Sequence, residues 1–213
     1  MTYIIGAGGN AQSIANVMYD LNITISGFVV DQPHVDSFIG HELIGFSELS
    51  SQGGEISCVI SIGHNSSRKL IYERLIRDRA GKVNFPTLVH PTAYVASSAT
   101  IGEGSVVFPL AAVGSACTVS KFVHLNTHSI VEHESEVGDF ASLAPGAVLG
   151  GATKIGCESA ILMNATVSNG TSVGECVVIG ANSFLKTSTG ANELWVGTPA
   201  RLKGARADFD QYF

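Results

Sequence analysis

The sequence has few charged residues and lacks the long apolar or basic stretches that define several protein classes. Only 14% of its 213 residues are charged, with 12 Lys and Arg against 18 Asp and Glu. A disordered chain combines low hydrophobicity with high charge, and a nucleic-acid binder needs cations that neutralise phosphates. Neither class fits this composition. A membrane span needs about 18 consecutive apolar residues, and because no such run exists we expect no membrane insertion.

Cysteine is also scarce, and its four positions are scattered without a C-x-x-C pair. The sequence therefore predicts neither a zinc knuckle nor a disulfide framework. Met1 is not followed by the charged and then apolar segment of a signal peptide. We expect a reduced, cytoplasmic protein without a bound metal.

An unbroken six-residue period organises the second half of the chain. Sixteen consecutive positions at this spacing are Ile, Leu or Val, and the position four residues after each is small or β-branched. A period of six fits neither an α-helix nor an alternating strand. It is typical of a triangular solenoid, in which each hexad forms one short face and one corner with its aliphatic side chain inside. The aliphatic positions are Val95, Ile101, Val107, Val113, Val119, Leu125, Val131, Val137, Leu143, Leu149, Ile155, Ile161, Val167, Val173, Ile179 and Leu185.

Glycine is abundant, at 24 residues, and it recurs directly after the aliphatic position. We expect the backbone to bend at these places, where a side chain would crowd the corner. Because each aliphatic side chain buries only a small apolar area, we also expect such prisms to associate. The glycines are Gly102, Gly114, Gly138, Gly150, Gly156, Gly174 and Gly180.

Residues 1–90 carry no hexads and alternate strand and helix patterns, which predicts a small parallel βαβ sheet. A helix after the first strand has apolar residues at helical spacing, and Ser66 or Ser67 is expected to cap a second helix. The expected strands are Thr2–Ile5, Ile25–Val30, Ser57–Ile62 and Val83–Val89. We therefore predict two domains, 1–90 and 91–213.

The first turn, Gly6 to Ala11, fits the pattern G-x-G-x-x-A, and Asp31 follows about 20 residues later, as in dinucleotide-binding folds. About 90 residues suit a mononucleotide diphosphate better than a complete NAD fold. Arg68 has two interpretations, a bidentate phosphate ligand or part of a solvated helix face. The ligand is expected at the carboxyl ends of the strands, near Gly8, Gly9, Asn10, Asp31, Gly63, His64, Asn65 and Arg68.

His133 occupies the third place of its hexad, near a corner, and Glu134 follows it. An outward imidazole beside a carboxylate suits a general base, because it accepts a proton near neutral pH while the acid stabilises the imidazolium. The alternative is an ordinary surface histidine. Cys117, at a fifth place, is expected to be packed rather than reactive.

The chain resembles the bacterial sugar acetyltransferases that join a small nucleotide-sugar domain to a hexapeptide-repeat domain. The group includes N-acetyltransferases of UDP-4-amino sugars, GDP-perosamine acetyltransferases and sialic-acid O-acetyltransferases. The resemblance implies a left-handed parallel β-helix after a half-Rossmann-like α/β domain, and a homotrimer. Its motifs are Ile5-Gly6-Ala7-Gly8-Gly9, the turn from Ile62-Gly63 to Arg68, His90-Pro91-Thr92-Ala93, Asn126-Thr127, His133-Glu134, Ala144-Pro145-Gly146-Ala147 and Val196-Gly197-Thr198-Pro199-Ala200-Arg201.

The resemblance assigns His133 as the base, with Glu134 beside it, and implies that acetyl-CoA lies in a groove between adjacent prisms. Two departures stand out. Asn10 replaces a histidine that is common after the glycine turn, and Ser142 and Ala144 stand where some members carry His and Ser. The implied acetyl-CoA contacts are Ser142, Ala144, Gly151, Gly180 and Pro199.

The resulting hypothesis is direct transfer of an acetyl group from acetyl-CoA to the amino group of a nucleotide-linked sugar, of the UDP-4-amino-4,6-dideoxy type, for glycan or surface polysaccharide biosynthesis. The N–H of Gly151 would stabilise the oxyanion. Acetylation of a hydroxyl, as in a sialic-acid O-acetyltransferase, stays open, because one base serves both acceptors.

Two further interpretations compete with it. A zinc carbonic anhydrase-like enzyme would use His124, His128 and His133, and a non-enzymatic sensor would use the nucleotide domain alone. The other histidines are read as structural or solvated. The aromatic tail is expected to cap the solenoid, with Trp195, Phe209, Tyr212 and Phe213.

Overall fold

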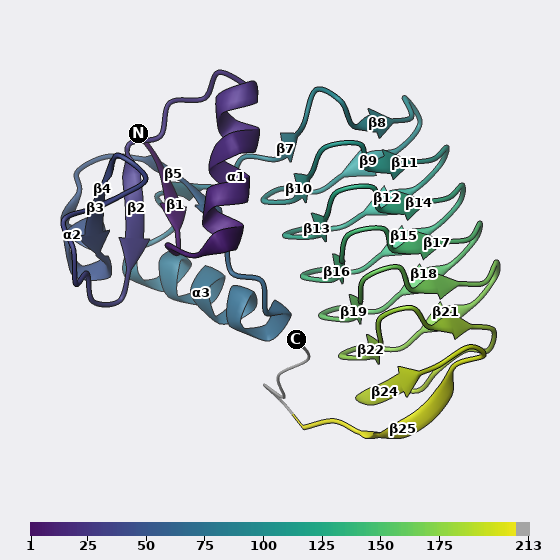
Figure 1. Ribbon diagram of the computed structural model, residues 1–213. Helices are drawn as coiled ribbons and strands as arrows, with labels where there is room; N and C mark the ends of the chain where they lie inside the picture. The colour runs from purple at the N-terminus through teal and green to yellow at the C-terminus, as the bar shows by residue number, and fades with distance from the viewer. Residues whose placement is uncertain (208–213) are drawn as a thin grey trace. The chain divides into compact units, whose positions relative to one another are not determined.

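The computed structural model describes residues 1–207 and divides the chain into two compact units, Met1–Leu88 and Val89–Phe213. Phe209, Tyr212 and Phe213 lie outside the described residues. Within 1–207 no helix is long and apolar enough to cross a bilayer. Each unit is described by itself below (Figure 1).

The first unit is a six-stranded sheet in the order β3-β4-β2-β1-β5-β6, parallel except for the β3–β4 pair. Buried aliphatic residues of α1, among them Ile14, Val17 and Met18, supply an apolar helix face. The hairpin and α2 were not anticipated from the sequence, since each is very short. The elements are β1 (Thr2–Ile5), α1 (Gly9–Asp20), β2 (Gly27–Val30), β3 (Ser37–Phe38), β4 (His41–Gly45), α2 (Phe46–Ser51), β5 (Ile56–Ile60), α3 (Asn65–Asp78) and β6 (Val83–Asn84).

Two expected boundaries of this unit differ in the structure. The strand expected over Val83–Val89 is divided into β6 and β7 (Leu88–Val89), and Pro86, which has no N–H to donate, lies between them. The expected serine caps of α3 are also replaced. The N-cap is His64, whose Nδ1 accepts the Ser67 N–H at 3.4 Å.

The second unit is a three-sided prism of two-residue strands (Figure 1). Each strand pairs in parallel with the strand 18 residues later, for example Val113 with Val131. Face 1 comprises β7, β10 (Val106–Val107), β13 (His124–Leu125), β16 (Ser142–Leu143), β19 (Ala160–Ile161), β22 (Val178–Ile179), β24 (Glu193–Val196) and the antiparallel edge strand β25 (Arg201–Ala205).

Faces 2 and 3 complete each coil. Face 2 comprises β8 (Tyr94–Val95), β11 (Ala112–Val113), β14 (Ile130–Val131), β17 (Val148–Leu149), β20 (Thr166–Val167) and β23 (Phe184–Leu185). Face 3 comprises β9 (Thr100–Ile101), β12 (Thr118–Val119), β15 (Glu136–Val137), β18 (Lys154–Ile155) and β21 (Ser172–Val173).

The sixteen aliphatic positions of the period form the core of the prism. Each is the second residue of one of the strands β8 to β23. Those from Val107 to Leu185 are buried, and Val95 and Ile101 pack against them. Trp195, in β24, packs partly buried against the same core and lies opposite Ile179.

The corners differ from the expectation in where the backbone turns. A left-handed φ recurs at the third residue after each aliphatic position from Ile101 to Ile179, whatever its type, including Leu110, Phe122 and Glu134. The glycines directly after the aliphatic residue serve close approach between coils instead. A Cβ on Gly102 would lie 2.6 Å from the carbonyl carbon of Ser120.

Candidate active site

The carboxyl ends of three parallel strands bring the first group of candidate residues to one edge of the sheet. Ile5 lies opposite Val29 of β2 and Ile60 of β5. The glycine turn, Asp31 and the turn over residues 61–65 therefore leave the sheet side by side. This is the edge at which open parallel sheets bind ligands.

The glycine turn is closed on its inner side and open on its outer side. Gly6 has φ +111°, and a Cβ there would lie 2.6 Å from Ser61 Oγ, which donates to the Ile5 carbonyl at 2.6 Å. Gly8 and Gly9 are exposed, and a Cβ on either would meet nothing within 4 Å. Gly8 is the N-cap of α1, so its surroundings offer free N–H groups and the positive end of a helix dipole.

Asn10 is fixed to the neighbouring turn. Its Nδ2 donates to the Ser61 carbonyl at 2.8 Å. The amide thus links the start of α1 to the residue that follows β5, and its oxygen remains an acceptor at the same edge.

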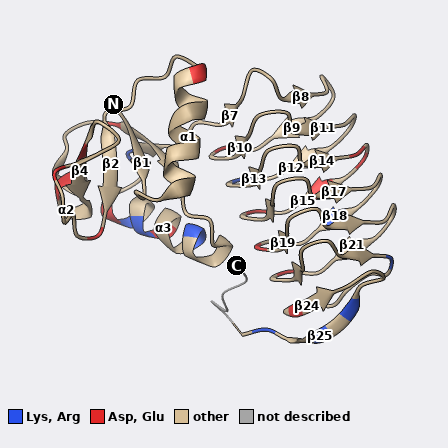
Figure 2. Ribbon diagram, viewed as in Figure 1, with Lys and Arg blue, Asp and Glu red and all other residues tan. Residues whose placement is uncertain are grey.

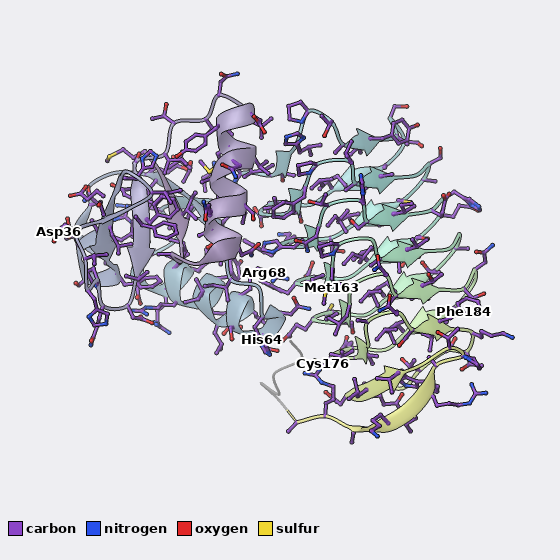
Figure 3. All side chains as sticks on the ribbon, viewed as in Figure 1. Asp36, His64, Arg68, Met163, Cys176 and Phe184 are labelled. Atoms are coloured by element: carbon purple, nitrogen blue, oxygen red, sulfur yellow. The ribbon has the colours of Figure 1, made fainter. Side chains whose placement is uncertain are left out.

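Arg68 differs from both of its interpretations. It is fully buried, so it does not belong to a solvated face. Its guanidinium donates to the carbonyls of Ile62 at 2.9 Å and Gly63 at 3.3 Å, and to Asn65 Oδ1 at 2.9 Å. Asn65 is buried as well. These two residues hold the turn together from inside, near the end of α3 that also carries His64 (Figure 3).

Asp31 is exposed and pairs with an arginine that the sequence analysis did not single out. Its Oδ1 lies 2.5 Å from Arg74 Nη1, on α3, whose basic residues are visible in Figure 2. The guanidinium of Arg74 also stacks over Phe46, 3.8 Å from the ring centroid. A carboxylate held in this way at a strand end is oriented, while its other oxygen can still accept a hydrogen bond.

In the second unit, His133 and Glu134 form the corner between faces 2 and 3. Glu134 is at the left-handed position, with φ +59°. Its N–H donates to the Ser115 carbonyl at 2.9 Å, and the Ala152 N–H donates to the His133 carbonyl at 2.8 Å. The corner is therefore hydrogen-bonded to the coils on both sides.

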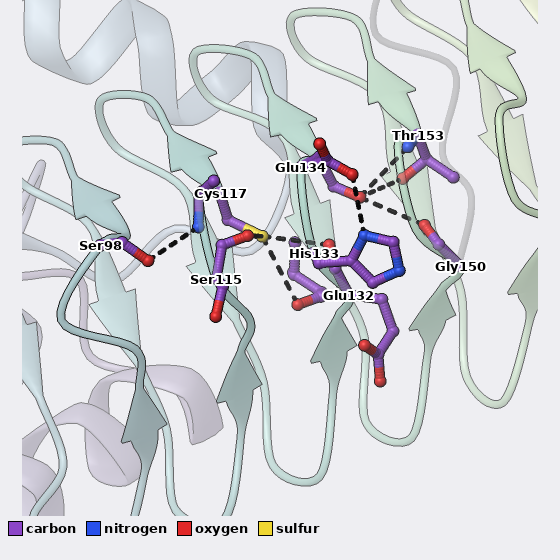
Figure 4. A network of polar contacts seen from close by, with 11 residues as sticks. Ser98, Ser115, Cys117, Glu132, His133, Glu134, Gly150 and Thr153 are labelled. Atoms are coloured by element: carbon purple, nitrogen blue, oxygen red, sulfur yellow. Dashed lines mark hydrogen bonds and ion pairs between the residues drawn. The ribbon is translucent and has the colours of Figure 1, made fainter.

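The two side chains of this corner are in contact. His133 Nδ1 lies 3.1 Å from Glu134 Oε2, and both side chains are more than half exposed (Figure 4). Because a carboxylate only accepts hydrogen bonds, Nδ1 carries the proton and the neutral ring presents a lone pair on Nε2. This is the tautomer that a general base requires.

Gly151 lies under the His133 ring, one coil later. A Cβ on residue 151 would stand 2.5 Å from Cε1 and 2.6 Å from Nε2. The absence of a side chain is what allows the imidazole to occupy this place. The relationship was not foreseen, although 133 and 151 differ by the 18 residues of one coil and occupy the same place in their hexads.

The remaining acetyl-CoA candidates lie elsewhere on the prism. Ser142 begins β16 on face 1, opposite His124 and Ala160. A Cβ on Gly180 would approach Val196 Cγ1 to 2.7 Å, so this glycine admits β24. Pro199 is exposed, and Ala144 is partly exposed beside β16. Within one chain, these residues are not gathered at the corner of His133.

The zinc interpretation finds no such gathering either. His124 is on face 1 and buried, whereas His128 and His133 lie at two different corners. Among residues 1–207 there is no group of three His, Cys, Asp or Glu side chains placed to hold a metal ion.

Comparisons with known proteins agree with this architecture. Residues 2–75 match the PglD N-terminal domain. The acetyltransferase domain of PglB from Neisseria gonorrhoeae, solved with acetyl coenzyme A, is 31% identical over 94% of this chain and 98% of that chain, with a TM-score of 0.86. The chain belongs to the bacterial nucleotide-sugar acetyltransferases of the hexapeptide-repeat type.

Two other members of this family are similar. PerB from Caulobacter crescentus, solved with CoA and GDP-perosamine, is 25% identical over 95% of this chain and 97% of that chain, with a TM-score of 0.87. UDP-N-acetylbacillosamine N-acetyltransferase from Bacillus subtilis is 34% identical over 109 residues, a match that spans about half of either chain. Family membership confirms the expected fold class, an α/β domain followed by a left-handed parallel β-helix.

Proposed function

We propose that this acetyltransferase transfers the acetyl group of acetyl-CoA to the amino group of a nucleotide-linked amino sugar, of the UDP-4-amino-4,6-dideoxy type, for glycan or surface polysaccharide biosynthesis in the cytoplasm. The observation that carries the proposal is the His133 ring held between Glu134 and Gly151. The substrates named for the similar proteins, GDP-perosamine and UDP-N-acetylbacillosamine, are nucleotide-linked sugars of this kind.

The chemistry is a direct transfer. The sugar amine attacks the thioester carbonyl and passes a proton to His133 Nε2. Glu134, at Nδ1, stabilises the imidazolium that forms. The N–H of Gly151 donates to the developing oxyanion. When the C–S bond breaks, the imidazolium returns the proton to the departing CoA thiolate.

The nucleotide binds at the carboxyl edge of the first unit. The open turn at Gly8 and Gly9 and the start of α1 receive the diphosphate. The carboxylate of Asp31, oriented by Arg74, accepts from ribose or base. Gly63 and His64 line the neighbouring turn, which Arg68 and Asn65 support from inside. Asn10 contributes a hydrogen bond to the sugar rather than a second proton carrier.

A homotrimer completes the acetyl-CoA site. The outward residues of face 2 form an uncharged row, with Tyr94 63% exposed, whereas those of face 3 include the exposed ion pair of Glu136 and Lys154. An apolar row of this kind suits packing against a second copy. The groove between copies would then bring Ser142, Ala144, Gly180 and Pro199 of one prism near His133 and Gly151 of another. The row on face 2 is Tyr94, Ala112, Ile130, Val148, Thr166 and Phe184 (Figure 3).

The test is a panel of nucleotide sugars incubated with acetyl-CoA while the release of free thiol is followed. The panel pairs 4-amino sugars with their 4-hydroxy counterparts on UDP, GDP and dTDP. We expect thiol release with the UDP amino sugar and product acetylated on nitrogen. Release with the hydroxy compounds alone would assign O-acetylation. Binding of nucleotide sugars without binding of acetyl-CoA would overturn the proposal in favour of a sensor.

A further inference from the structure

Three serines at corners of the prism share one hydrogen-bonding arrangement. Ser105, Ser135 and Ser159 each donate the hydroxyl to the carbonyl 15 residues later and accept the backbone N–H 18 residues later. Each side chain thereby brackets a corner of the following coil. The bracketed groups are the carbonyls of Ser120, Gly150 and Gly174, at 2.8, 3.2 and 2.7 Å, and the N–H groups of Val123, Thr153 and Val177, at 2.9, 3.1 and 2.9 Å.

Cys117 occupies the equivalent place one coil before Ser135. It is buried, and its Sγ donates to the carbonyl of Glu132, 15 residues later, at 3.0 Å. Burial raises the pKa of the Cys117 thiol, although nearby backbone groups, Ser135 among them, lower it in part. At neutral pH the sulfur therefore keeps the proton that it donates.

The corners held by Cys117 and Ser135 are the two that carry the proposed chemistry. The corner from Glu132 to Ser135 presents His133, and the corner from Gly150 to Thr153 presents the Gly151 backbone under its ring (Figure 4). Ser135 also contacts Thr153 Oγ1 at 3.0 Å. Cys117, Ser135 and Thr153 are thus successive members of one column, 18 residues apart.

We propose that Cys117 and Ser135 are positioning residues, which together fix the separation between the His133 imidazole and the Gly151 N–H. The inference rests on the function proposed above and adds two buried side chains that touch neither substrate. Since a misplacement of about 1 Å at a catalytic group can lower a rate ~100-fold, a partial relaxation of one corner should lower kcat measurably. The KM values should not change, because the binding surfaces stay intact.

The variants are Cys117→Ala, which removes the donor, and Cys117→Ser, which substitutes the hydroxyl used at the other corners. Cys117→Val is the second donor-free variant, because valine already fills the equivalent fifth place at Val123 and Val177. The matched control is Ser159→Ala, which removes the same contact from the corner of Gly174. Circular dichroism and the melting temperature establish that each variant is folded.

We expect Cys117→Ala, Cys117→Val and Ser135→Ala to lower kcat about tenfold with both KM values within twofold of the parent protein. Cys117→Ser should restore the rate, and Ser159→Ala should leave it unchanged. An undiminished kcat in the folded donor-free variants, or an equal loss in Ser159→Ala, would overturn the proposal.

Hydrogen–deuterium exchange of peptides covering residues 130–136 provides a readout that does not depend on activity. Exchange should be faster in Cys117→Ala than in the parent protein and unchanged in Ser159→Ala. If the parent protein transferred no acetyl group, the proposed function would fail while this measurement still decided whether Cys117 holds the corner. Equal exchange in Cys117→Ala and the parent protein would show that it does not.

Discussion

The His133 imidazole occupies the space that a side chain on Gly151 would fill, with an ideal Cβ 2.5 Å from Cε1 and 2.6 Å from Nε2. With Nδ1 held by Glu134, the ring is fixed by a carboxylate on one side and a bare backbone on the other. This arrangement aims Nε2 at a site beside the backbone of Gly151. A base and an oxyanion donor in one place are what acyl transfer to an amine requires.

Gly151→Ala tests this contact. The added methyl group displaces the ring, which is free to swing outward because the His133 side chain is 58% exposed. We expect a folded protein whose kcat is lower by about 100-fold, measured by thiol release. Gly204→Ala is the control, since a Cβ there meets nothing within 4 Å. Normal activity in Gly151→Ala would show that the ring position is not catalytically important.

His133→Ala tests the base itself. Loss of general base catalysis lowers kcat by about 10²–10⁴, whereas binding of both substrates should persist, as measured by calorimetry. Glu134→Gln keeps a hydrogen-bond acceptor but removes the charge that stabilises the imidazolium, so its loss should be smaller. A fully active His133→Ala variant would remove the assignment.

The prism could be predicted from the sequence because every inward position repeats, so sixteen residues report one structural feature. The left-handed corner position could not. It is occupied by residues as different as Leu110, Phe122 and Glu134, since the coil-to-coil hydrogen bonds impose the conformation regardless of propensity. The short hairpin β3–β4 and α2 were missed because two to six residues carry little periodic signal.

The site was predictable where residue type alone indicates chemistry, as for His133 beside Glu134. It was not predictable where a role depends on partners distant in the chain. Arg68 was read from its charge, yet its guanidinium is committed to the carbonyls of Ile62 and Gly63. Arg74 was overlooked because its partner Asp31 is 43 residues away. Such pairings arise from tertiary contacts rather than from local patterns.

Arg68→Met tests whether the turn over residues 62–65 is held from inside. Each buried carbonyl left without a donor costs about 1–3 kcal/mol, so the melting temperature should fall. The relaxed turn should raise KM for the nucleotide sugar without changing KM for acetyl-CoA. Arg77→Met, at a side chain that is 71% exposed, is the matched control. A normal KM together with normal stability would contradict this role.

Ile130→Lys tests the row on face 2. A lysine ammonium buried in an apolar contact between copies is costly unless it finds a partner. We expect the trimer to dissociate, as measured by size-exclusion chromatography with light scattering, and activity to fall with it. Thr118→Lys places the same charge on the exposed row of face 3 and should change neither. A stable trimer in Ile130→Lys would exclude face 2 as the interface.

Cys58 gives the first unit an alkaline limit of stability. It is fully buried in β5, and burial raises the pKa of its thiol from 9.0 to about 12. Below pH 9 the thiol is protonated in both the folded and the unfolded chain. As the pH rises from 9 toward 12, the unfolded chain loses its proton first, so this thiol lowers the free energy of unfolding by about 1.4 kcal/mol per pH unit. Cys58→Val removes the group, and its melting temperature should therefore fall less steeply than that of the parent protein between pH 9 and 10.5. The control Cys157→Val, at a half-buried cysteine, should follow the parent protein, and parallel curves for Cys58→Val and the parent would contradict the prediction.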